Sequence, residues 1–463
     1  MIGHIEAVLA SLRATLPAER VMTDAADCLA YGYDNSRRCA APQAVVVALN
    51  AEDVALTVRA CREHAVPLTV RGRGTNTTGA SVPVAGGVVL TLERMNRVIE
   101  YRPADRLMVV EPGVLNAEVQ RIAEADGLFW APDPTSAAYS TVGGNLACGA
   151  GGPRAVKYGT ARDAVLGLRA VTGNGDLIRS GGETTKGVVG YDLTRLLIGS
   201  EGTLAVITEA TLKLLPRPTE RRMLRACYVD TTAAIAAVVR LMGQADLPCA
   251  VEFMDGAAVA LAQAWRDTGV PAATGALLLI EVDGSAASVS LTQQAVAAVA
   301  AAGDGVVAVD VAETAAHAEA LWACRKALSP SLRKLAPKKV NEDVAVPVSR
   351  LPLLLAEVEA IAASGGLQIV NFGHAGNGNI HVNILADPDD PAQMSAITPA
   401  LSRLFRKVLD LGGTLSGEHG VGIDKREFVA WEIDAVTLAL MHSLKRVFDP
   451  VGILNPGKTL PGP

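Results

Sequence analysis

The sequence predicts an α+β protein of more than one domain, whose loops gather around a ligand. Its 463 residues are too many for one ordinary hydrophobic core. Half of them are hydrophobic and 19% are charged, which is typical of a compact globular chain. From residue 44 to residue 216, short β-branched runs alternate with helical segments and glycine-rich turns, and this pattern indicates sheets covered by helices.

The first domain is expected over residues 1–217, with its core from residue 40. Residues 1–16 predict an amphipathic helix, because their apolar side chains recur at helical spacing. Further along, the pattern predicts a helix at 51–65 and strands at 44–49, 68–71, 87–92, 107–111, 165–171 and 204–214. An α+β domain with one ligand between its loops is the simplest interpretation.

The pattern changes after the Pro-Arg-Pro sequence at 216–218, where we place a domain boundary. Alanine-rich helices are expected at 231–242, 256–267 and 286–301, with strands at 250–254 and 276–282. Alternation at this length is typical of a ferredoxin-like domain or a small sandwich. The second domain should cover residues 218–424. Residues 425–463 predict a helical segment that is too short to fold alone and packs back on the first domain.

Composition excludes several classes of protein. The net charge is −6 and no basic stripe with aromatic residues occurs, which argues against nucleic-acid binding. The seven cysteines are scattered and never form a CxxC pair, so a cysteine zinc cluster or an iron–sulfur site is excluded and reduced thiols in a cytoplasm are expected. No signal peptide and no apolar run of membrane-spanning length is found, although peripheral association at the inner membrane through a partner stays open.

The first glycine-rich loop covers residues 71–79, Arg-Gly-Arg-Gly-Thr-Asn-Thr-Thr-Gly. Closely spaced glycines let backbone N–H groups line a concave site for phosphate oxygens. The GxGxxG pattern fails because residue 77 is threonine, and the Walker pattern fails because Ala80 replaces the lysine. Taken alone, the loop could equally be an ordinary turn.

Two further loops strengthen the ligand interpretation. Residues 132–152 contain five glycines between positions 143 and 152, which argues against a stable helix or an ordinary strand there. Residues 197–207 form a tight turn that leads into a strand. Each loop alone could be an ordinary turn. Three glycine-rich loops in one domain indicate that the backbone there must approach a ligand closely.

The three loops together resemble the FAD-binding domain of the vanillyl-alcohol oxidase type. The stretches RGRGTNTTG, DPTSAAYSTVGGNLACGAGG, KYGTARD, GYDLTRLLIGSEGTLAVITEATLKL and LNPGK resemble in particular the family of D-lactate dehydrogenase, glycolate oxidase and D-2-hydroxyglutarate dehydrogenase. The resemblance implies a two-lobed FAD-binding domain, followed by a substrate domain that carries a metal site. Because no histidine occurs between His64 and His317, the FAD should be bound non-covalently.

The resemblance also implies which residues hold FAD. Those of the first loop would hold the pyrophosphate: Arg71, Gly72, Arg73, Gly74, Thr75, Asn76, Gly79 and Ser81. Those of the second loop would also bind the cofactor: Pro134, Thr141, Gly143, Gly144, Asn145, Gly151 and Gly152, with Thr141, Gly144 and Asn145 bordering the flavin. Glu201, Gly202 and Ile207 would lie toward the nucleotide, and Asn455 near the flavin ring.

Three of the seven histidines fall between residues 374 and 419. Residues seven apart on one strand point to opposite faces, but the Ala-Gly-Asn-Gly-Asn sequence permits a bend that brings His374 and His381 together. Buried core histidines are the simpler alternative. The resemblance implies His374, His381 and Glu418 as ligands of a divalent metal and His419 as the base. Two imidazoles and one carboxylate suit Zn²⁺, with Mn²⁺ or Fe²⁺ as alternatives.

A substrate carboxylate needs a cation, and arginine binds it with two parallel hydrogen bonds. The resemblance implies that Arg325 supplies this contact, with Ser329 one helical turn on; a surface arginine is the alternative. The family's second cation has no clear counterpart, since Asn341 stands nearest its place and Lys338 and Lys339 lie upstream. Asn383 could hydrogen bond the substrate or only pair within a strand.

The implied activity is the FAD-dependent oxidation of a small D-2-hydroxy acid, with the hydride passing to flavin N5 and the hydroxyl proton to His419. D-lactate, glycolate and D-2-hydroxyglutarate all stay open as the substrate. The electron acceptor would be a quinone, a cytochrome, an electron-transfer flavoprotein or a partner subunit, and a homodimer stays open. The alternatives are an FAD-binding subunit without chemistry of its own, a non-redox flavoenzyme of the ether-lipid synthase type, and a metal-dependent hydrolase, which leaves the glycine loops unexplained.

Overall fold

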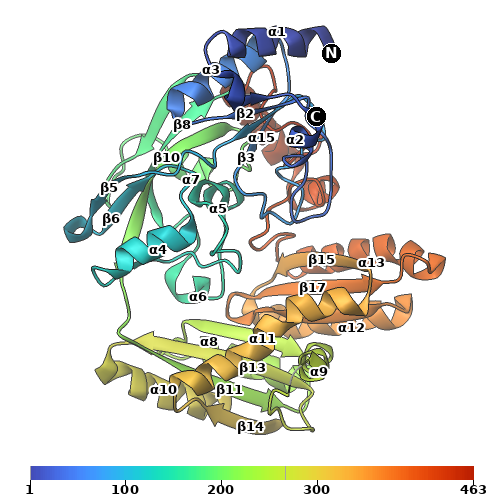
Figure 1. Ribbon diagram of the computed structural model, residues 1–463. Coiled ribbons are helices and arrows are strands. Elements are labelled where there is room, and N and C mark those ends of the chain that lie inside the picture. The colour runs from blue at the N-terminus through green and yellow to red at the C-terminus, as the bar shows by residue number, and fades with distance from the viewer. Residues whose placement is uncertain (1, 266, 463) are drawn as a thin grey trace. The chain divides into compact units, whose positions relative to one another are not determined.

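A computed structural model describes residues 2–265 and 267–462 (Figure 1). The chain divides into two compact units. Unit 1 consists of Met1–Gly152, Gly159–Arg217 and Glu418–Pro463, and unit 2 of Pro153–Tyr158 and Pro218–Gly417. Where the sequence suggested boundaries after residues 217 and 424, the units divide after Arg217 and Gly417, and the short piece from Pro153 to Tyr158 belongs to unit 2.

Unit 1 contains two sheets with separate hydrophobic cores. A four-stranded sheet has the order β1-β2-β4-β3, formed by Val21–Met22, Ala44–Val47, Val88–Thr91 and Leu68–Arg71. A six-stranded sheet has the order β5-β6-β10-β8-β9, with β7 paired to β10; its strands are Val98–Arg102, Leu107–Val110, Ala205–Pro216, Val165–Thr172, Leu177–Gly181 and Leu128–Trp130. The strands expected in this domain are therefore present, with ends that differ by one or two residues.

The helices of unit 1 cover these sheets and fill the C-terminal segment. They are α1 (Ile2–Arg13), α2 (Ala25–Leu29), α3 (Ala51–Glu63), α4 (Asn116–Glu124), α5 (Val142–Cys148), α7 (Leu193–Leu197), α14 (Val429–Glu432) and α15 (Ala435–Phe448). Helices α1 and α3 pack on the core of the four-stranded sheet, which also contains Ile453 and Leu454 from the end of the chain. Residues near the end of the chain thus belong to the core of unit 1.

Helix α5 corrects one prediction, since the glycine content of residues 143–152 argued against any helix there. Thr141 caps the helix by accepting a hydrogen bond from the N–H of Gly144 at 3.2 Å. Val142 and Leu146 are buried on one helix face, and Gly149 ends the helix in the left-handed conformation. A cap, a C-terminal glycine and buried apolar contacts together outweigh the low helix propensity of Gly143 and Gly144.

Unit 2 is built on a seven-stranded sheet with the order β14-β11-β13-β12-β16-β17-β15, in which every pair is antiparallel. In chain order these strands are β11 (Glu220–Tyr228), β12 (Ala250–Asp255), β13 (Ala276–Gly284), β14 (Val306–Val311), β15 (Lys338–Ala345), β16 (Gln368–His374) and β17 (Asn379–Ala386). The helices are α6 (Ala155–Tyr158), α8 (Thr231–Met242), α9 (Gly256–Trp265), α10 (Ala286–Ala300), α11 (Ala315–Leu335), α12 (Leu351–Gly365) and α13 (Pro391–Asp410).

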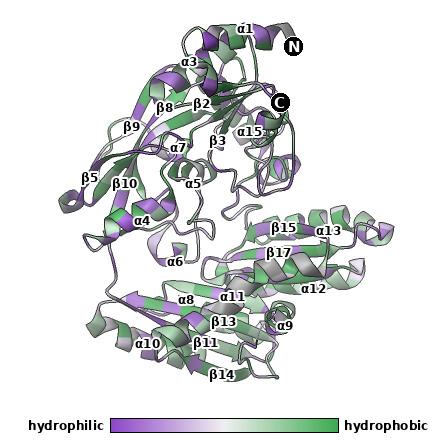
Figure 2. Ribbon diagram, in the orientation of Figure 1, coloured by the Kyte–Doolittle hydropathy of each residue, from purple (hydrophilic) through white to green (hydrophobic). Residues whose placement is uncertain are grey.

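The connections of this sheet match the expected ferredoxin-like domain and extend it. The series β11-α8-β12-β13-α10-β14 has that arrangement, with α9 inserted between β12 and β13. The series β15-α12-β16-β17-α13 repeats most of it, and the two halves join where β12 pairs with β16. Apolar side chains occupy the strands, as the green colour of β13 and β17 in Figure 2 shows.

One face of this sheet gathers polar residues. Successive side chains along a strand point to opposite faces, and residues paired across strands share a face. Glu252 on β12 pairs with His374 on β16, Phe372 pairs with His381 on β17, and His381 pairs with Asp343 on β15. All five side chains therefore lie on one face of the sheet, which places the candidate site.

Candidate functional site

The two histidines predicted to lie together do so. His374 ends β16 and His381 lies in β17, and the short 3-10 helix η4 (Ala375–Asn377) reverses the chain between them. The ring centroids are 5.2 Å apart, at an interplanar angle of 86°, and both side chains are buried. Gly378 makes the reversal possible, because its φ is +73° and a Cβ there would lie 1.8 Å from the Val346 carbonyl oxygen.

Glu252 orients the first histidine. Its carboxylate accepts a hydrogen bond from Nδ1 of His374, and its other oxygen accepts one from Nε of Arg325 at 2.9 Å. Burial raises the pKa of Glu252, but the charges of His374 and Arg325 lower it to about 2. With Nδ1 bound to an ionised carboxylate, Nε2 is the His374 nitrogen that a metal would use.

Asp343 stands in a similar relation to the second histidine. Oδ1 of this fully buried carboxylate lies 3.5 Å from Nδ1 of His381 and accepts a hydrogen bond from the Asn379 amide at 2.6 Å. Carboxylates beside Nδ1 of both histidines are the outer shell typical of histidine–metal sites. The donor set therefore fits a divalent metal.

The third predicted ligand follows directly in the chain. The N–H of Gly417 donates to the carbonyl oxygen of Asp343 at 3.1 Å, so the last residue of unit 2 is held beside β15. A Cβ at Gly417 would lie 2.3 Å from Nδ2 of Asn379, so no side chain fits there. Glu418, peptide-bonded to Gly417, is the first residue of the last piece of unit 1.

Arg325 is not a surface residue, because only 12% of its side chain is exposed. Its guanidinium lies over the ring of Phe372, 4.5 Å from the ring centroid, on the face of the sheet that carries the histidines. The structure thus argues against the alternative of a solvent-facing helix residue. Ser329 lies in α11, but its side chain is outside the described residues.

Asn383 is fully buried and lies two residues after His381 in β17. Its amide Nδ2 donates to the carbonyl oxygens of Val370 and His381 at 3.0 and 3.1 Å, which fixes the orientation of the amide. Its Oδ1 atom, and that of Asn341 directly opposite on β15, have no hydrogen-bond partner among the described residues. Of the two lysines considered as a second cation, Lys338 is exposed and Lys339 is half-buried.

In unit 1, the first glycine loop is organised by Asn76. Its Oδ1 accepts hydrogen bonds from the N–H groups of Thr78 and Ala80 at 2.9 and 3.0 Å. Gly72 allows close approach to Thr141 of the second loop, since a Cβ there would lie 2.5 Å from the Thr141 Oγ1 atom. The two loops that were predicted to share a ligand therefore touch.

The remaining predicted FAD residues lie in the same unit. Arg71 is buried near two tyrosine rings and donates to the Tyr33 carbonyl oxygen, while Arg73 pairs with Glu93 at 3.2 Å and is half exposed. The others belong to the loops or to the strands and turns beside them: Gly74, Thr75, Gly79, Ser81, Pro134, Gly143, Gly144, Asn145, Gly151, Gly152, Gly202 and Ile207.

Asn145 has a buried side-chain N–H donor that a ligand could use. It is 4% exposed, and its Nδ2 atom has no hydrogen-bond partner among the described residues. A buried amide without a partner costs free energy unless a ligand or water accepts its hydrogen bond. The donor fits a flavin carbonyl or phosphate oxygen, so the residues present fit FAD.

Glu201 has a role that the sequence did not indicate. Its carboxylate accepts hydrogen bonds from the N–H groups of Val421 and Gly422 at 2.9 Å and from the Thr459 hydroxyl. It thereby holds the loop that follows His419. Asn455 donates to the carbonyl oxygens of Glu201 and Ala80 at 2.6 and 2.9 Å.

His419 itself is tied to the first glycine loop through its backbone. Its carbonyl oxygen accepts a hydrogen bond from Nδ2 of Asn76 at 3.1 Å and from the Thr78 hydroxyl at 3.4 Å. The predicted base and the predicted pyrophosphate loop are therefore neighbours within unit 1. The sequence analysis did not identify Glu252 or Asp343. A charged residue between apolar neighbours was an available signal for Glu252, whereas Asp343 lies in a strand with several other polar residues.

Comparisons with known proteins cover nearly the whole chain. Residues 217–459 match the family model "FAD linked oxidases, C-terminal domain", and residues 42–181 match "FAD binding domain". The chain is 38% identical to glycolate oxidase subunit GlcD of Bacillus subtilis, over 93% of this chain and 92% of the relative. It is 34% identical to D-lactate dehydrogenase of Anaerostipes hadrus, over 90% of each chain, and 33% identical to D-2-hydroxyglutarate dehydrogenase of Stutzerimonas stutzeri, over 98% of each.

Solved structures share the fold at low sequence identity. p-Cresol methylhydroxylase has a TM-score of 0.84 at 18% identity, covering 100% of this chain and 98% of its own. Alkyldihydroxyacetonephosphate synthase has a TM-score of 0.76 at 19% identity, covering 97% of this chain and 84% of its own. These likenesses concern the fold alone. Within the described residues, no helix has the length and apolar character needed to cross a membrane.

Proposed function

The chain belongs to the family of FAD-linked oxidases, and on that premise we propose that it oxidises a small D-2-hydroxy acid to the 2-oxo acid with the help of a divalent metal. It is an FAD-linked oxidoreductase of the D-lactate, glycolate and D-2-hydroxyglutarate dehydrogenase type, and its fold is the vanillyl-alcohol oxidase type expected from the sequence. The proposal adds the metal, the substrate class and the role of each residue.

One observation carries the proposal: two buried imidazoles lie side by side, each with a carboxylate at Nδ1. A pair of core histidines would not need a buried carboxylate beside each ring. We assign His374, His381 and Glu418 as the ligands, with Zn²⁺ preferred over Mn²⁺ and Fe²⁺. Glu252 holds the ring of His374 in the tautomer that metal binding needs, and Asp343 lies 3.5 Å from Nδ1 of His381.

The other residues bind and orient the substrate and move one proton. When bound, FAD supplies the electron acceptor and the metal supplies a Lewis acid beside the 2-hydroxyl group. Arg325 binds the substrate carboxylate, since Glu252 holds only its Nε edge. His419 accepts the hydroxyl proton, and Asn76 and Glu201 fix its loop.

Two asparagine oxygens suggest what the rest of the substrate carries. Oδ1 of Asn383 and Oδ1 of Asn341 can only accept hydrogen bonds, and the Asn383 amide cannot turn without losing two bonds to carbonyl oxygens. A second carboxylate would place oxygen against oxygen there. A short acid or one with a terminal hydroxyl group suits this place better than D-2-hydroxyglutarate.

Two alternatives use the same fold. A non-redox flavoenzyme like the ether-lipid synthase would not need the histidine–carboxylate arrangement. An FAD-binding subunit without chemistry of its own would not need it either. The relatives named as glycolate oxidase subunits favour an active chain that passes electrons to a partner subunit, although a quinone, a cytochrome or an electron-transfer flavoprotein would serve the same chemistry.

The experiment that tests the substrate is anaerobic reduction of the purified flavoprotein. Glycolate, D-lactate, L-lactate, D-glycerate and D-2-hydroxyglutarate are each added, and the loss of flavin absorbance is followed. We expect D-lactate, glycolate or D-glycerate to bleach the flavin fastest, and D-2-hydroxyglutarate more slowly. A flavin that no 2-hydroxy acid bleaches would favour the non-redox alternative.

A further inference from the structure

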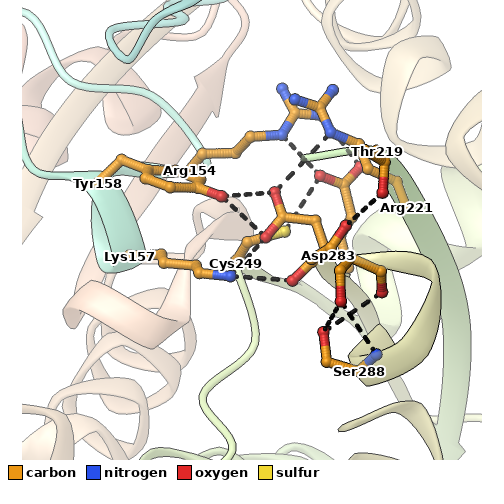
Figure 3. A network of polar contacts seen from close by, with 11 residues as sticks. Arg154, Lys157, Tyr158, Thr219, Arg221, Cys249, Asp283 and Ser288 are labelled. Carbon is orange, nitrogen blue, oxygen red and sulfur yellow. Dashed lines mark hydrogen bonds and ion pairs between the residues drawn. The ribbon is translucent and has the colours of Figure 1, made fainter. Parts of the chain in front are cut away.

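The piece from Pro153 to Tyr158 has a polar attachment to unit 2 that no part of the proposed chemistry uses. The chain leaves unit 1 at Gly152 and returns to it at Gly159, and the six residues between them belong to unit 2. Three of these, Arg154, Lys157 and Tyr158, carry side chains that reach the end of β13 (Figure 3). Helix α6 occupies most of the piece.

Two buried carboxylates on β13, those of Glu281 and Asp283, bind these side chains. Glu281 accepts two hydrogen bonds from Arg154, from Nε at 2.6 Å and from an NH2 nitrogen at 2.9 Å. Asp283 accepts one from Nζ of Lys157 at 2.6 Å, and the Tyr158 hydroxyl, 2.9 Å from both carboxylate oxygens, shares its one hydrogen between them. Charge-assisted and bidentate bonds of this kind fix direction as well as distance.

The same carboxylates could be mistaken for a metal site, since ligand atoms of Cys249, Glu281 and Asp283 lie within 4.8 Å of one another. The charges argue against a cation. Arg154 and Lys157 already neutralise the two carboxylates, and Arg221 lies 3.9 Å from Asp283. The Cys249 thiol is buried and directs its hydrogen toward Glu281 at 3.3 Å. The cluster is complete without an ion.

On its other side, α6 supports the turn between the two histidines. A Cβ at Gly376, in the middle of η4, would lie 3.1 Å from Cγ2 of Val156 and 3.4 Å from Cβ of Val251. The turn is thus packed between α6 and β12, with bare backbone facing Val156. Since η4 joins His374 to His381, any shift of α6 changes the support of the turn that sets the distance between the two rings.

We propose that residues 153–158 act as a clasp that positions the histidine pair: Arg154, Lys157 and Tyr158 anchor α6 on Glu281 and Asp283, and Val156 holds η4. The role of these residues is positioning, because their described contacts are with Glu281, Asp283 and the turn η4. The benefit of a buried charged network here is a single orientation of α6, which an apolar contact would fix less strictly. The metal part of this inference rests on the proposed function.

Two variants separate the anchor from the support. Asp283→Asn removes the charge that holds Lys157 and keeps the shape of the side chain. Val156→Ala leaves every ion pair and removes the methyl groups that face Gly376. Asp310→Asn is the matched control, because Asp310 on the edge strand β14 pairs with Arg225 on β11 at 3.0 Å and takes no part in the attachment of α6. If Asp283→Asn fails to fold, Tyr158→Phe replaces it, since this change removes the hydroxyl that binds Asp283 and keeps the ring.

Two measurements are made on the FAD-loaded protein: hydrogen–deuterium exchange of peptides that cover residues 375–381, and the dissociation constant of Mn²⁺ after removal of bound metal. We expect both test variants to speed exchange in this peptide and to weaken Mn²⁺ binding, by about tenfold for Asp283→Asn, with FAD content unchanged. The control variant should change neither quantity.

The outcomes distinguish this inference from the proposed function. Unchanged exchange over residues 375–381 in both test variants overturns the clasp. Mn²⁺ binding that Asp283→Asn abolishes and His381→Ala leaves intact also overturns it, because the ion would then lie at Cys249, Glu281 and Asp283. A wild-type protein that binds no Mn²⁺ or Zn²⁺ contradicts the proposed metal, while faster exchange in the variants would still support the clasp.

Discussion

Glu252 and His374 face each other across β12 and β16, and the carboxylate of Glu252 accepts the Nδ1 hydrogen of the imidazole. The same carboxylate holds Arg325, so one buried acid links the residue proposed to bind metal with the residue proposed to bind substrate. This link leads to the first prediction, because a change at Glu252 should affect both partners.

Glu252→Gln should weaken metal binding by about 10- to 100-fold, since the amide cannot act as a charged acceptor for His374. The KM for the acid should rise as well, because Arg325 loses the group that orients it. Metal titration of the FAD-loaded variant and steady-state kinetics check both effects. Glu359→Gln on the exposed side of α12 is the control. Wild-type metal affinity in Glu252→Gln would contradict the orienting role.

Replacing the proposed base should separate cofactor binding from turnover. His419→Asn should keep a full complement of FAD and lose about 10²- to 10⁴-fold in kcat, the range expected for loss of a general base. The backbone contacts of His419 with Asn76 and Thr78 do not involve the imidazole, so they should survive. Turnover and flavin content of this variant are compared with those of exposed His4→Asn. A near-normal kcat would exclude His419 as the base.

The geometry of Arg325 should matter more than its charge. Arg325→Lys keeps the charge but loses the planar fork and the stacking on Phe372, so kcat/KM for the acid should fall by about 10- to 100-fold. The expected loss lies mainly in KM. Arg403→Lys serves as the control, because Arg403 pairs with Glu357 at the surface of α12 and α13. Equal kcat/KM values for Arg325→Lys and wild type would contradict a bidentate contact.

Lys458 gives a prediction on pH. Burial lowers the pKa of its ammonium group to about 7, although Asp34 and Glu201 raise it. An unfolded lysine titrates near pH 10.4, so between about pH 7 and pH 10 the unfolded chain binds more protons than the folded one. The contribution of Lys458 to stability therefore rises with pH across this window, by up to about 1.4 kcal/mol per pH unit.

Lys458→Met provides the comparison, since methionine does not titrate. The free energy of unfolding of wild type minus that of the variant, measured in urea at matched FAD content, should be larger at pH 9 than at pH 7. A difference that does not depend on pH would show that Lys458 keeps an ordinary pKa in the folded protein.

The repeated local patterns of the sequence predicted most of the fold. Helix Thr231–Met242 and strand Leu68–Arg71 lie where periodicity placed them, because their apolar spacing and flanking turn residues agree. Helix α5 was missed, since the caps and buried contacts that stabilise Gly143 and Gly144 in a helix are tertiary features. The pairing of β12 with β16, which brings Glu252 to His374, joins residues 122 apart and has no local signal.

The site also combines features that have a local signal in the sequence with features that depend on tertiary contacts. The bend between His374 and His381 could be predicted from the glycines between them, and the structure confirms it. The roles of Glu252 and Asp343 depend on strand register, and that of Glu201 depends on where the C-terminal loop returns. The proposed clasp at residues 153–158 cannot be found from periodicity. These six residues belong to unit 2 but lie in the sequence between two pieces of unit 1, so they look like part of a loop.

The central claim is that a metal at His374, His381 and Glu418 is needed for oxidation of a 2-hydroxy acid and not for binding FAD. The most direct test is anaerobic bleaching of the flavin by the best substrate before and after treatment with a strong chelator. We predict that the treated protein stays yellow, is no longer bleached, and recovers when Zn²⁺ or Mn²⁺ is added back. Equal bleaching rates with and without the metal would contradict the claim.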